Sequence, residues 1–311
     1  MHLLRKWSVG CSQHLAAVLA ASSLALSAAC SNATAPKTDD RKTPEPAAQS
    51  AATSFSSDAT TITSAQRTPV QRTWTIEGVE REALVVAPTQ RAEGALAPVV
   101  FIFHGHGGRA AQVRRSYDAE KYWPEALFVY PQGLKTPGAL TDPEGRRAGW
   151  QSGAAAMGGR DLNFFDAILK SILTEQRGDP DRVYVTGHSN GGGFTYLLWS
   201  ERGAQLAAVG PSSAYARVGN DRPPLPAMHV AQRNDPLVKF DMQELTIAKI
   251  KATNGCVANS TQVAKSGKLY DSPTGTPVLV WVTDGTHKFD ATSVEPMMEF
   301  FRSHIRHGRS Q

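Results

Sequence analysis

The chain has 311 residues, of which 41% are hydrophobic and 20% charged, a balance typical of a globular protein with enough apolar residues for a sizeable core. Its net charge of +5 comes from Lys and Arg spread along the chain. Basic tracts interleaved with aromatic residues, which nucleic-acid grooves carry, do not occur, so we expect no nucleic-acid partner.

The first thirty residues have the pattern of a secretory signal. A basic start is followed by an apolar stretch from Leu15 to Leu26, which is too short for a membrane-spanning helix, and then by the small residues of "SAAC". Ordinary signal-peptidase cleavage and lipoprotein processing would both cut between Ala29 and Cys30. We favour the second interpretation, with a lipid on Cys30, although Leu26 lies one residue further from the cysteine than the usual lipobox has it.

The segment after the signal has the composition of a disordered linker. Residues 30–70 are rich in Ala, Ser, Thr and Pro, so they cannot bury enough apolar surface to offset their ordering entropy. Only Cys256 remains beyond Cys30, which excludes an internal disulfide framework. We expect a signal over 1–29, this linker, and one domain over 71–311. The protein should be exported, extracellular or lipid-anchored to the cell envelope, with membrane contact only through that lipid.

Beyond the linker, the sequence predicts strands and helices in alternation. A starting antiparallel hairpin is predicted over 72–76 and 82–88. The later strands are continuous apolar runs, typical of strands covered on both faces, and are expected at 99–103, 126–130, 182–187, 207–210, 227–231 and 278–282. Helices are expected at 161–178, 191–203 and 291–305. This alternation predicts a single α/β domain with a mostly parallel, doubly wound sheet.

One long segment, residues 132–159, does not fit the alternation. It contains seven glycines and two prolines and shows little periodicity. A loop of this length in a compact domain is typical of a functional rim or a lid. Its Trp150 either offers a stacking surface or anchors the loop, and we assign it to substrate binding.

Residues 187–191, Gly-His-Ser-Asn-Gly, match the motif G-x-S-x-G. A predicted strand precedes the motif and a predicted helix follows it, which is the context that the motif requires. The glycines are needed because side chains at those positions would clash in a strained turn. The turn directs the Ser189 hydroxyl to the carboxyl end of the sheet, beside a helix N-terminus that favours developing negative charge. We therefore predict that Ser189 is a nucleophile.

A serine nucleophile needs a general base and an acid that orients the base. In this architecture the chain order is Ser, then Asp or Glu, then His, each in a loop after a strand. Asp235 and His287 satisfy both conditions. Asp284 is the alternative acid, although its closeness to His287 suits a loop-shaping residue better. His229 lies inside a strand and is expected to be a core residue.

Backbone N–H donors for an oxyanion are expected at two places. Asn190 follows the nucleophile directly, and the glycine-rich turn "HGHGG" after the strand at 99–103 offers the N–H of His106, with Gly107 as the alternative. His104 and His106 stand two residues apart, but no matching carboxylate or cysteine set accompanies them. We expect no metal and no cofactor.

Several segments of the domain resemble those of a known family. From about Val99 to Phe301 the chain resembles the α/β-hydrolase esterases grouped with polyhydroxybutyrate depolymerases and feruloyl esterases, including bacterial lipoprotein members of that group. The similar segments, in the family's order, are "FHGHGG", "VYPQG", "GRDLNFFDAIL", "VYVTGHSNGGG", "RNDPLV", "NGC" and "GTHKFD". The resemblance implies an α/β-hydrolase catalytic domain that hydrolyses carboxylic esters through an acyl-enzyme, with Ser189, Asp235 and His287 at the triad positions.

Two departures from the family pattern bear on the substrate. Lys288 and Phe289 stand where many members have a Gly-His-x-Trp-Pro type segment, and the sequence ends soon after the last predicted helix, where secreted polymer depolymerases often continue into a binding domain. Both argue against solid polyester, and we expect a plant-cell-wall ester, a feruloyl or acetyl group on a polysaccharide. We expect the protein to be a monomer. The alternatives are a polyester depolymerase, a peptidase of the same fold, and an inactive hydrolase-fold binding protein of the cell envelope.

Overall fold

The computed structural model describes residues 67–138, 140–216 and 222–306 of the chain. All of them belong to the compact unit Thr61–Gln311. The predicted signal, Cys30 and most of the predicted linker lie outside the described residues. Within the described part, no helix is both long and apolar enough to cross a membrane.

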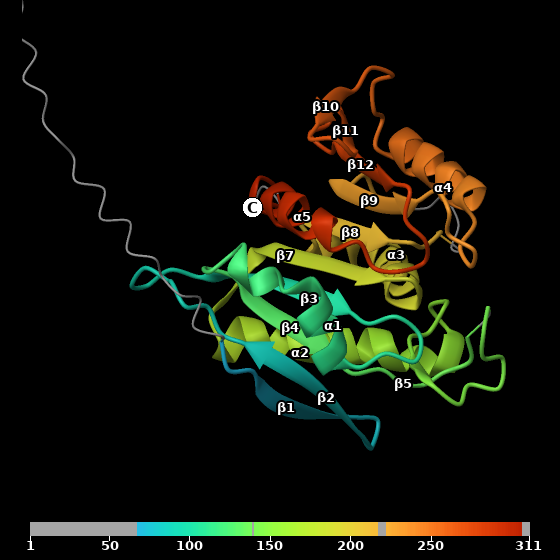
Figure 1. Ribbon diagram of the computed structural model, residues 1–311. Helices are drawn as coiled ribbons and strands as arrows, with labels where there is room; N and C mark the ends of the chain where they lie inside the picture. Colours follow the sequence, from blue (N-terminus) through green and yellow to red (C-terminus); the bar gives the residue numbers. More distant parts are fainter. Residues whose placement is uncertain (1–66, 139, 217–221, 307–311) are drawn as a thin grey trace, which may run out of the picture. The chain divides into compact units, whose positions relative to one another are not determined.

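The main sheet has ten strands in the described chain. In chain order they are β1 (Val70–Ile76), β2 (Val79–Val86), β3 (Ala97–Phe103), β4 (Leu127–Pro131), β7 (Gly178–His188), β8 (Ala208–Ser212), β9 (Ala227–Gln232), β10 (Thr261–Val263), β11 (Gly267–Tyr270) and β12 (Val278–Thr283). Their spatial order is β1-β2-β4-β3-β7-β8-β9-β12-β11-β10 (Figure 1). The middle strands from β4 to β12 are parallel, and both edges are antiparallel. A separate pair, β5 (Leu134–Lys135) with β6 (Ala148–Gly149), lies within the 132–159 loop.

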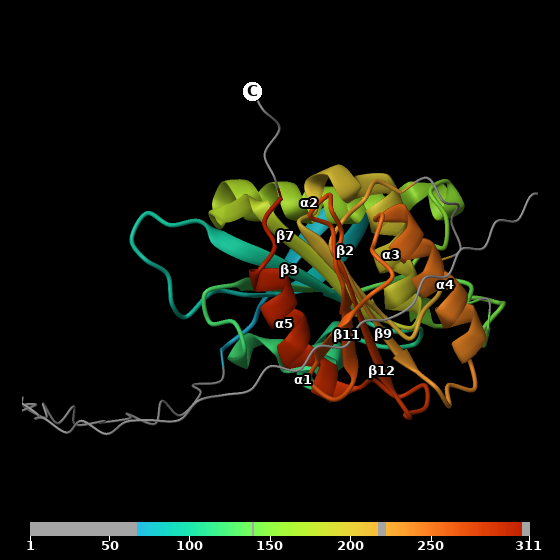
Figure 2. The same cartoon turned by 90° about the horizontal axis from the view of Figure 1, so that it is seen from above.

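Helices cover both faces of the sheet. They are α1 (Ala110–Tyr117), α2 (Arg160–Glu175), α3 (Asn190–Arg202), α4 (Phe240–Thr253) and α5 (Val294–Arg302), with short 3-10 turns η1 (Ala119–Lys121), η2 (Ala156–Gly159), η3 (Gly203–Gln205) and η4 (Ala291–Ser293). Figure 2 shows α2 and α3 on one side of the sheet and α1 and α5 on the other. The predicted doubly wound α/β fold, with its starting antiparallel hairpin, is confirmed.

Strand β3 shows why continuous apolar runs form the middle of this sheet. All seven of its residues are buried, because helices cover both of its faces. Val99, Phe101 and Phe103 pack in the core beneath α2 and α3, whereas Val100 and Ile102 pack beneath α1 and α5. Alternate side chains of one strand therefore fill two separate cores.

Besides the short pair β5 and β6 and the 3-10 turns, four elements were not predicted from the sequence. Helix α1 is only eight residues long. In α4, two of the four buried residues, Gln243 and Thr246, are polar, so the sequence shows no continuous apolar face. Strands β10 and β11 are only three and four residues long, and three of their seven residues are exposed, so their composition carries little strand signal. These two strands extend the sheet beyond β12 as a second antiparallel edge.

A buried ion pair joins the sheet to the start of α2. The guanidinium of Arg81 on β2 lies 2.8 Å from the carboxylate of Asp161, and both side chains are almost fully buried. The other carboxylate oxygen of Asp161 accepts the backbone N–H of Gln151, whose side-chain oxygen accepts the N–H of Asp161. The last part of the 132–159 loop is thereby fastened to α2.

Candidate active site

Ser189 occupies the tight turn between β7 and α3. Its φ of 57° and ψ of −117° lie in a region that non-glycine residues rarely adopt. A Cβ on Gly187 would come within 2.6 Å of the backbone of Gly191, and one on Gly191 would collide with the carbonyl oxygen of Phe103. The two motif glycines are therefore required because strand, turn and helix backbones touch here.

The side chains of Ser189, His287 and Asp235 form a hydrogen-bonded series. The Ser189 Oγ lies 2.7 Å from Nε2 of His287, and Nδ1 of His287 lies 2.8 Å from Oδ2 of Asp235. An Nδ1–H that donates to the carboxylate leaves Nε2 as the acceptor for the serine proton. The arrangement can thus transfer a proton from Ser189 to His287 while the carboxylate stabilises the charged ring.

Three loops at one edge of the sheet bring these side chains together. Ser189 follows β7, Asp235 follows β9 and His287 follows β12, so all three leave the carboxyl ends of parallel strands. Asp235 is buried, and its second oxygen, Oδ1, accepts the backbone N–H groups of Leu237 and Val238 at 2.9 and 2.8 Å. These bonds hold the carboxylate in a fixed orientation toward His287.

The two rival positions have other partners. Asp284 lies on the surface, with its side chain 85% exposed, and is paired with Arg233 at 3.2 Å. His229 is fully buried in β9, where the hydroxyl of Tyr196 contacts its Nδ1 at 2.5 Å. Burial lowers the pKa of His229 to about 4, so its ring is neutral at physiological pH. It is a core residue, as its place in a strand indicates.

His188, inside the motif, braces the loop that carries His287. Its Nε2 donates to the carbonyl oxygen of His287 at 2.9 Å, and the amide of Gln232 donates to the next carbonyl, that of Lys288, at 2.9 Å. The ring of Phe289 stacks on Tyr117 with centroids 3.9 Å apart. Burial, and then the neighbouring His287, lower the pKa of His188 to about 4, which keeps the ring neutral. Sequence reasoning did not identify this bracing contact.

The turn after β3 lies directly against Ser189. A Cβ on Gly105 would lie 3.6 Å from Cβ of Ser189. His104 is buried, and burial lowers its pKa to about 4; its Nδ1 donates to the carbonyl of Gly105 and its Nε2 accepts the N–H of Gly133 at 2.9 Å. The N–H of Gly107 donates to the carbonyl of Ala148 at 2.6 Å. Gly107 is therefore already engaged and is a poor alternative to His106.

The N–H groups of His106 and Asn190 are free of protein acceptors within the described ranges. The imidazole of His106 is held in place because its Nε2 donates to Asp142 at 2.9 Å. This hydrogen bond, with smaller contributions from the N–H groups of Arg147 and Arg146, lowers the pKa of Asp142 to about 2. Groups of three or more His, Cys, Asp or Glu suited to a metal ion do not occur among the residues that the structure describes.

Trp150 is an anchor for the 132–159 loop and not a substrate surface, which corrects the assignment made from the sequence. Its side chain is 1% exposed, and its indole N–H donates to the carbonyl of His104 at 2.8 Å. The ring packs between Phe103 and Phe194. Its backbone N–H and carbonyl both bond the side-chain amide of Asn190. Trp150 thus fixes the loop against the helix that follows the nucleophile.

A pocket of about 310 Å³ opens over Ser189 and His287. Part of its wall comes from the 132–159 loop and includes the exposed Leu140, and another part includes Leu237 from the loop after Asp235. Polar side chains, among them Arg147, Gln151 and Tyr215, share the lining. The pocket is the size of a small-molecule site, with a mixed apolar and polar wall.

Comparison with known proteins identifies the family. Residues 83–263 match the model of the esterase PHB depolymerase family. A probable feruloyl esterase C of Aspergillus oryzae is 28% identical over 190 residues, which are 60% of this chain and 66% of that protein. The bifunctional acetylxylan esterase/xylanase XynS20E of Neocallimastix patriciarum is 30% identical over 113 residues, which are 34% of this chain and 17% of that protein. The chain thus spans just under two thirds of the first relative and a sixth of the second.

Solved structures agree on the fold. The acetyl xylan esterase from Aspergillus awamori superimposes with a TM-score of 0.55 at 12% identity, covering 75% of this chain and 99% of that one. The match to the family model spans more than half of the sequence and includes the turn at Ser189. This chain belongs to the esterase PHB depolymerase family and has the α/β-hydrolase fold.

Proposed function

We propose that the protein is a serine hydrolase of carboxylic esters, with Ser189 as nucleophile, His287 as general base and Asp235 as its orienting acid. One observation carries the proposal: the continuous series Ser189 Oγ, His287, Asp235 at 2.7 and 2.8 Å, with Ser189 and His287 in the wall of a pocket. Membership of a family of esterases supports the reaction class.

The reaction follows from this geometry. His287 takes the proton of Ser189 as the hydroxyl attacks the ester carbonyl, and Asp235 stabilises the imidazolium that results. The N–H groups of His106 and Asn190 are assigned to the developing oxyanion, together with the N-terminus of α3. His287 then protonates the leaving alcohol, and in the second half it activates water to release the acid from Ser189.

For the substrate we propose a feruloyl or acetyl ester on a plant polysaccharide. The name of the Aspergillus oryzae relative supports a feruloyl ester and that of the Neocallimastix patriciarum relative an acetyl ester. The walls near Leu140 and Leu237 offer apolar surface to an acyl group, while the open mouth leaves room for a sugar chain outside. A polyester and a peptide bond are the competing substrates.

Labelling with a fluorophosphonate tests the nucleophile. The protein should be labelled in a single position, and Ser189→Ala should abolish the adduct. Ser152→Ala is the matched control, because Ser152 also lines the pocket and its removal should leave labelling intact. Labelling of the Ser189→Ala protein at an unchanged rate, or a complete lack of label on the wild type, would refute the proposal, and the second result would favour an inactive binding protein.

A substrate panel tests the ester. Methyl ferulate, acetylated xylan, a short-chain polyhydroxyalkanoate and a peptide anilide should be compared by kcat/KM on the same preparation. We expect the first two to exceed the peptide anilide by several orders of magnitude. A preference for the polyester or the anilide would replace the proposed substrate class.

We also propose that the protein is exported as a monomer, with residues 1–29 removed, Cys30 lipidated, a linker to residue 70 and the catalytic domain over 71–311. The basic, apolar and small-residue order of the first thirty residues supports this processing. Cys30→Ser should shift the protein from the membrane fraction to the soluble fraction of an expressing bacterium. An unchanged membrane fraction would argue against lipidation.

A further inference from the structure

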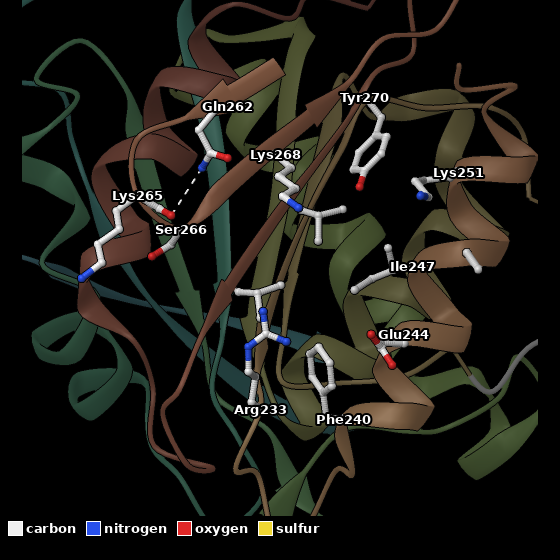
Figure 3. A pocket seen from close by; sticks show the side chains of 13 residues that line it. Arg233, Phe240, Glu244, Ile247, Lys251, Gln262, Lys265, Ser266, Lys268 and Tyr270 are labelled. Atoms are coloured by element: carbon white, nitrogen blue, oxygen red, sulfur yellow. Dashed lines mark hydrogen bonds between the residues drawn. The ribbon is translucent and has the colours of Figure 1, made fainter. Parts of the chain in front are cut away.

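A second hollow lies between α4 and the antiparallel edge of the sheet. It has a volume of about 340 Å³ and is walled by α4 on one side and by β10, β11 and β12 on the other (Figure 3). Its apolar lining comes from Ile247, Val280 and Val282. We refer to this hollow as the α4 groove. It plays no part in the chemistry at Ser189.

The α4 groove is strongly basic. Four cationic residues line it, against the single carboxylate of Glu244: Arg233 after β9, Lys251 on α4, Lys265 in the turn before β11 and Lys268 on β11. Figure 3 shows the side chain of Lys265 directed outward, away from the other three. No carboxylate of the described residues lies within 4 Å of the three lysine ammonium groups. Arg233 does pair with Asp284, but that carboxylate is 85% exposed, so solvent screens the pair.

Aromatic rings contact two of these cations, of which Arg233 also has the exposed Asp284 as a partner. The guanidinium of Arg233 lies 5.1 Å from the ring centroid of Phe240, and Nζ of Lys251 lies 3.9 Å from that of Tyr270. Figure 3 shows these two pairs at opposite ends of the groove, with Ile247 between them. A cation held over an aromatic ring is oriented without being neutralised. The positive charge of the groove therefore remains available to an anionic ligand.

The α4 groove begins beside the candidate active site. Arg233 leaves the carboxyl end of β9, two residues before Asp235. Leu237 lines the pocket over Ser189, and Phe240 lines the groove. The short loop that carries the acid thus separates the two hollows. From Phe240 to Lys251 the groove follows α4 for roughly 16 Å, since a helix rises 1.5 Å per residue.

We propose that the α4 groove binds carboxylate-bearing sugar units, uronates, of the polymer whose ester is held over Ser189. Lys and Arg suit the carboxylate, and the apolar floor suits the carbon face of a sugar ring. Single-stranded nucleic acid fits less well, because the two rings already carry cations and are not open platforms for bases. This inference rests on the proposed ester hydrolysis, because it requires one polymer to occupy both the pocket over Ser189 and the α4 groove.

The test uses one polymer in two charge states. Acetylated glucuronoxylan is compared with the same polymer after its uronate carboxylates have been reduced to alcohols, and 4-nitrophenyl acetate serves as a small reference ester. Lys251→Gln with Lys268→Gln removes two cations from the groove. Lys170→Gln with Lys249→Gln is the matched control, because both lysines are exposed, Lys249 lies on α4 itself, and neither lines the groove.

At low ionic strength, kcat/KM on the acidic polymer relative to the small ester should fall about five- to tenfold in the groove variant. The ratio should stay unchanged in the control variant and on the reduced polymer, and 0.5 M NaCl should remove the difference. Equal ratios for wild type and groove variant on the acidic polymer would overturn the proposal, and so would an equal loss in the control.

A binding measurement separates this inference from the proposed reaction. Ser189→Ala protein should be retarded in gels containing glucuronoxylan and not in gels containing the reduced polymer, and the added groove substitutions should abolish the retardation. If retardation behaves in this way while the wild type hydrolyses no ester, the groove stands and the proposed function fails. Equal mobility in both gels would refute the groove whatever the activity.

Discussion

Replacing Gly149 with alanine should disturb both proposed oxyanion donors at once. A Cβ at this position would lie 2.7 Å from Nδ1 of His106 and 2.9 Å from Oδ1 of Asn190. Neither side chain can swing away freely, because the ring of His106 is bonded to Asp142 and the amide of Asn190 is bonded to the backbone of Trp150. The added methyl group must therefore push the donor-bearing turn and the start of α3 apart.

The size of the effect follows from what such donors contribute. Loss of one oxyanion donor costs about 10²–10³ in kcat. In Gly149→Ala the donors are displaced and not removed, so we expect kcat to fall about 10- to 100-fold, equivalent to roughly 1.4–2.8 kcal/mol of transition-state stabilisation. KM should change much less. Overpacking at the site should lower the free energy of unfolding by about 1–3 kcal/mol, which leaves the protein folded at 25 °C.

Gly153→Ala is the matched control for this experiment. Gly153 lies in the same 132–159 loop, and a Cβ there would meet no atom within 4 Å. Steady-state kinetics on 4-nitrophenyl acetate give kcat and KM, and thermal melting reports folding. A folded Gly149→Ala protein with kcat within twofold of wild type would refute the assignment of the oxyanion donors, as would an equal loss in Gly153→Ala.

Three other predictions address the base, the core and the pH dependence. Asp235→Asn should lower kcat by about 10⁴ with an unchanged fold, because an amide favours the wrong tautomer of His287; a loss under tenfold would point to another acid. Asp161→Asn should lower the free energy of unfolding by about 3–5 kcal/mol, since it leaves the buried Arg81 without its counter-charge, and a urea midpoint equal to that of wild type would contradict this. Three histidines, the buried His104 and His229 and the half-buried His188, have a folded pKa of about 4, below the ordinary 6.5. The unfolded chain therefore binds more protons between these values, and the free energy of unfolding should fall as the pH drops from 6.5 to 4. The slope should approach about 1.4 kcal/mol per pH unit for each of His104, His188 and His229. A urea midpoint that does not change with pH over this range would show that the fold does not keep these rings neutral.

Elements with a repeated local signal were predictable. The strand at β3 follows from five consecutive apolar residues, and α2 follows from apolar residues at three- and four-residue steps. Helix α4 was not predictable in this way, because Gln243 and Thr246 are buried through hydrogen bonds to Val238 and Met242. The place of Trp150 was equally hidden, since an indole in a glycine-rich loop looks the same in sequence whether it faces solvent or the core.

The sequence by itself determined the tight turn at Ser189, because the need for glycine at 187 arises from the backbone of Gly191, four residues away. The family resemblance and the chain order were enough to select Asp235 and His287 as candidates. Only the tertiary structure placed them, since His287 lies 98 residues from Ser189 and 52 from Asp235, and their contact depends on parallel strands ending at one edge. The tertiary structure likewise decided which N–H groups are free and where lysines without a carboxylate partner gather. Both depend on contacts between segments far apart in the chain, which no local sequence pattern predicts.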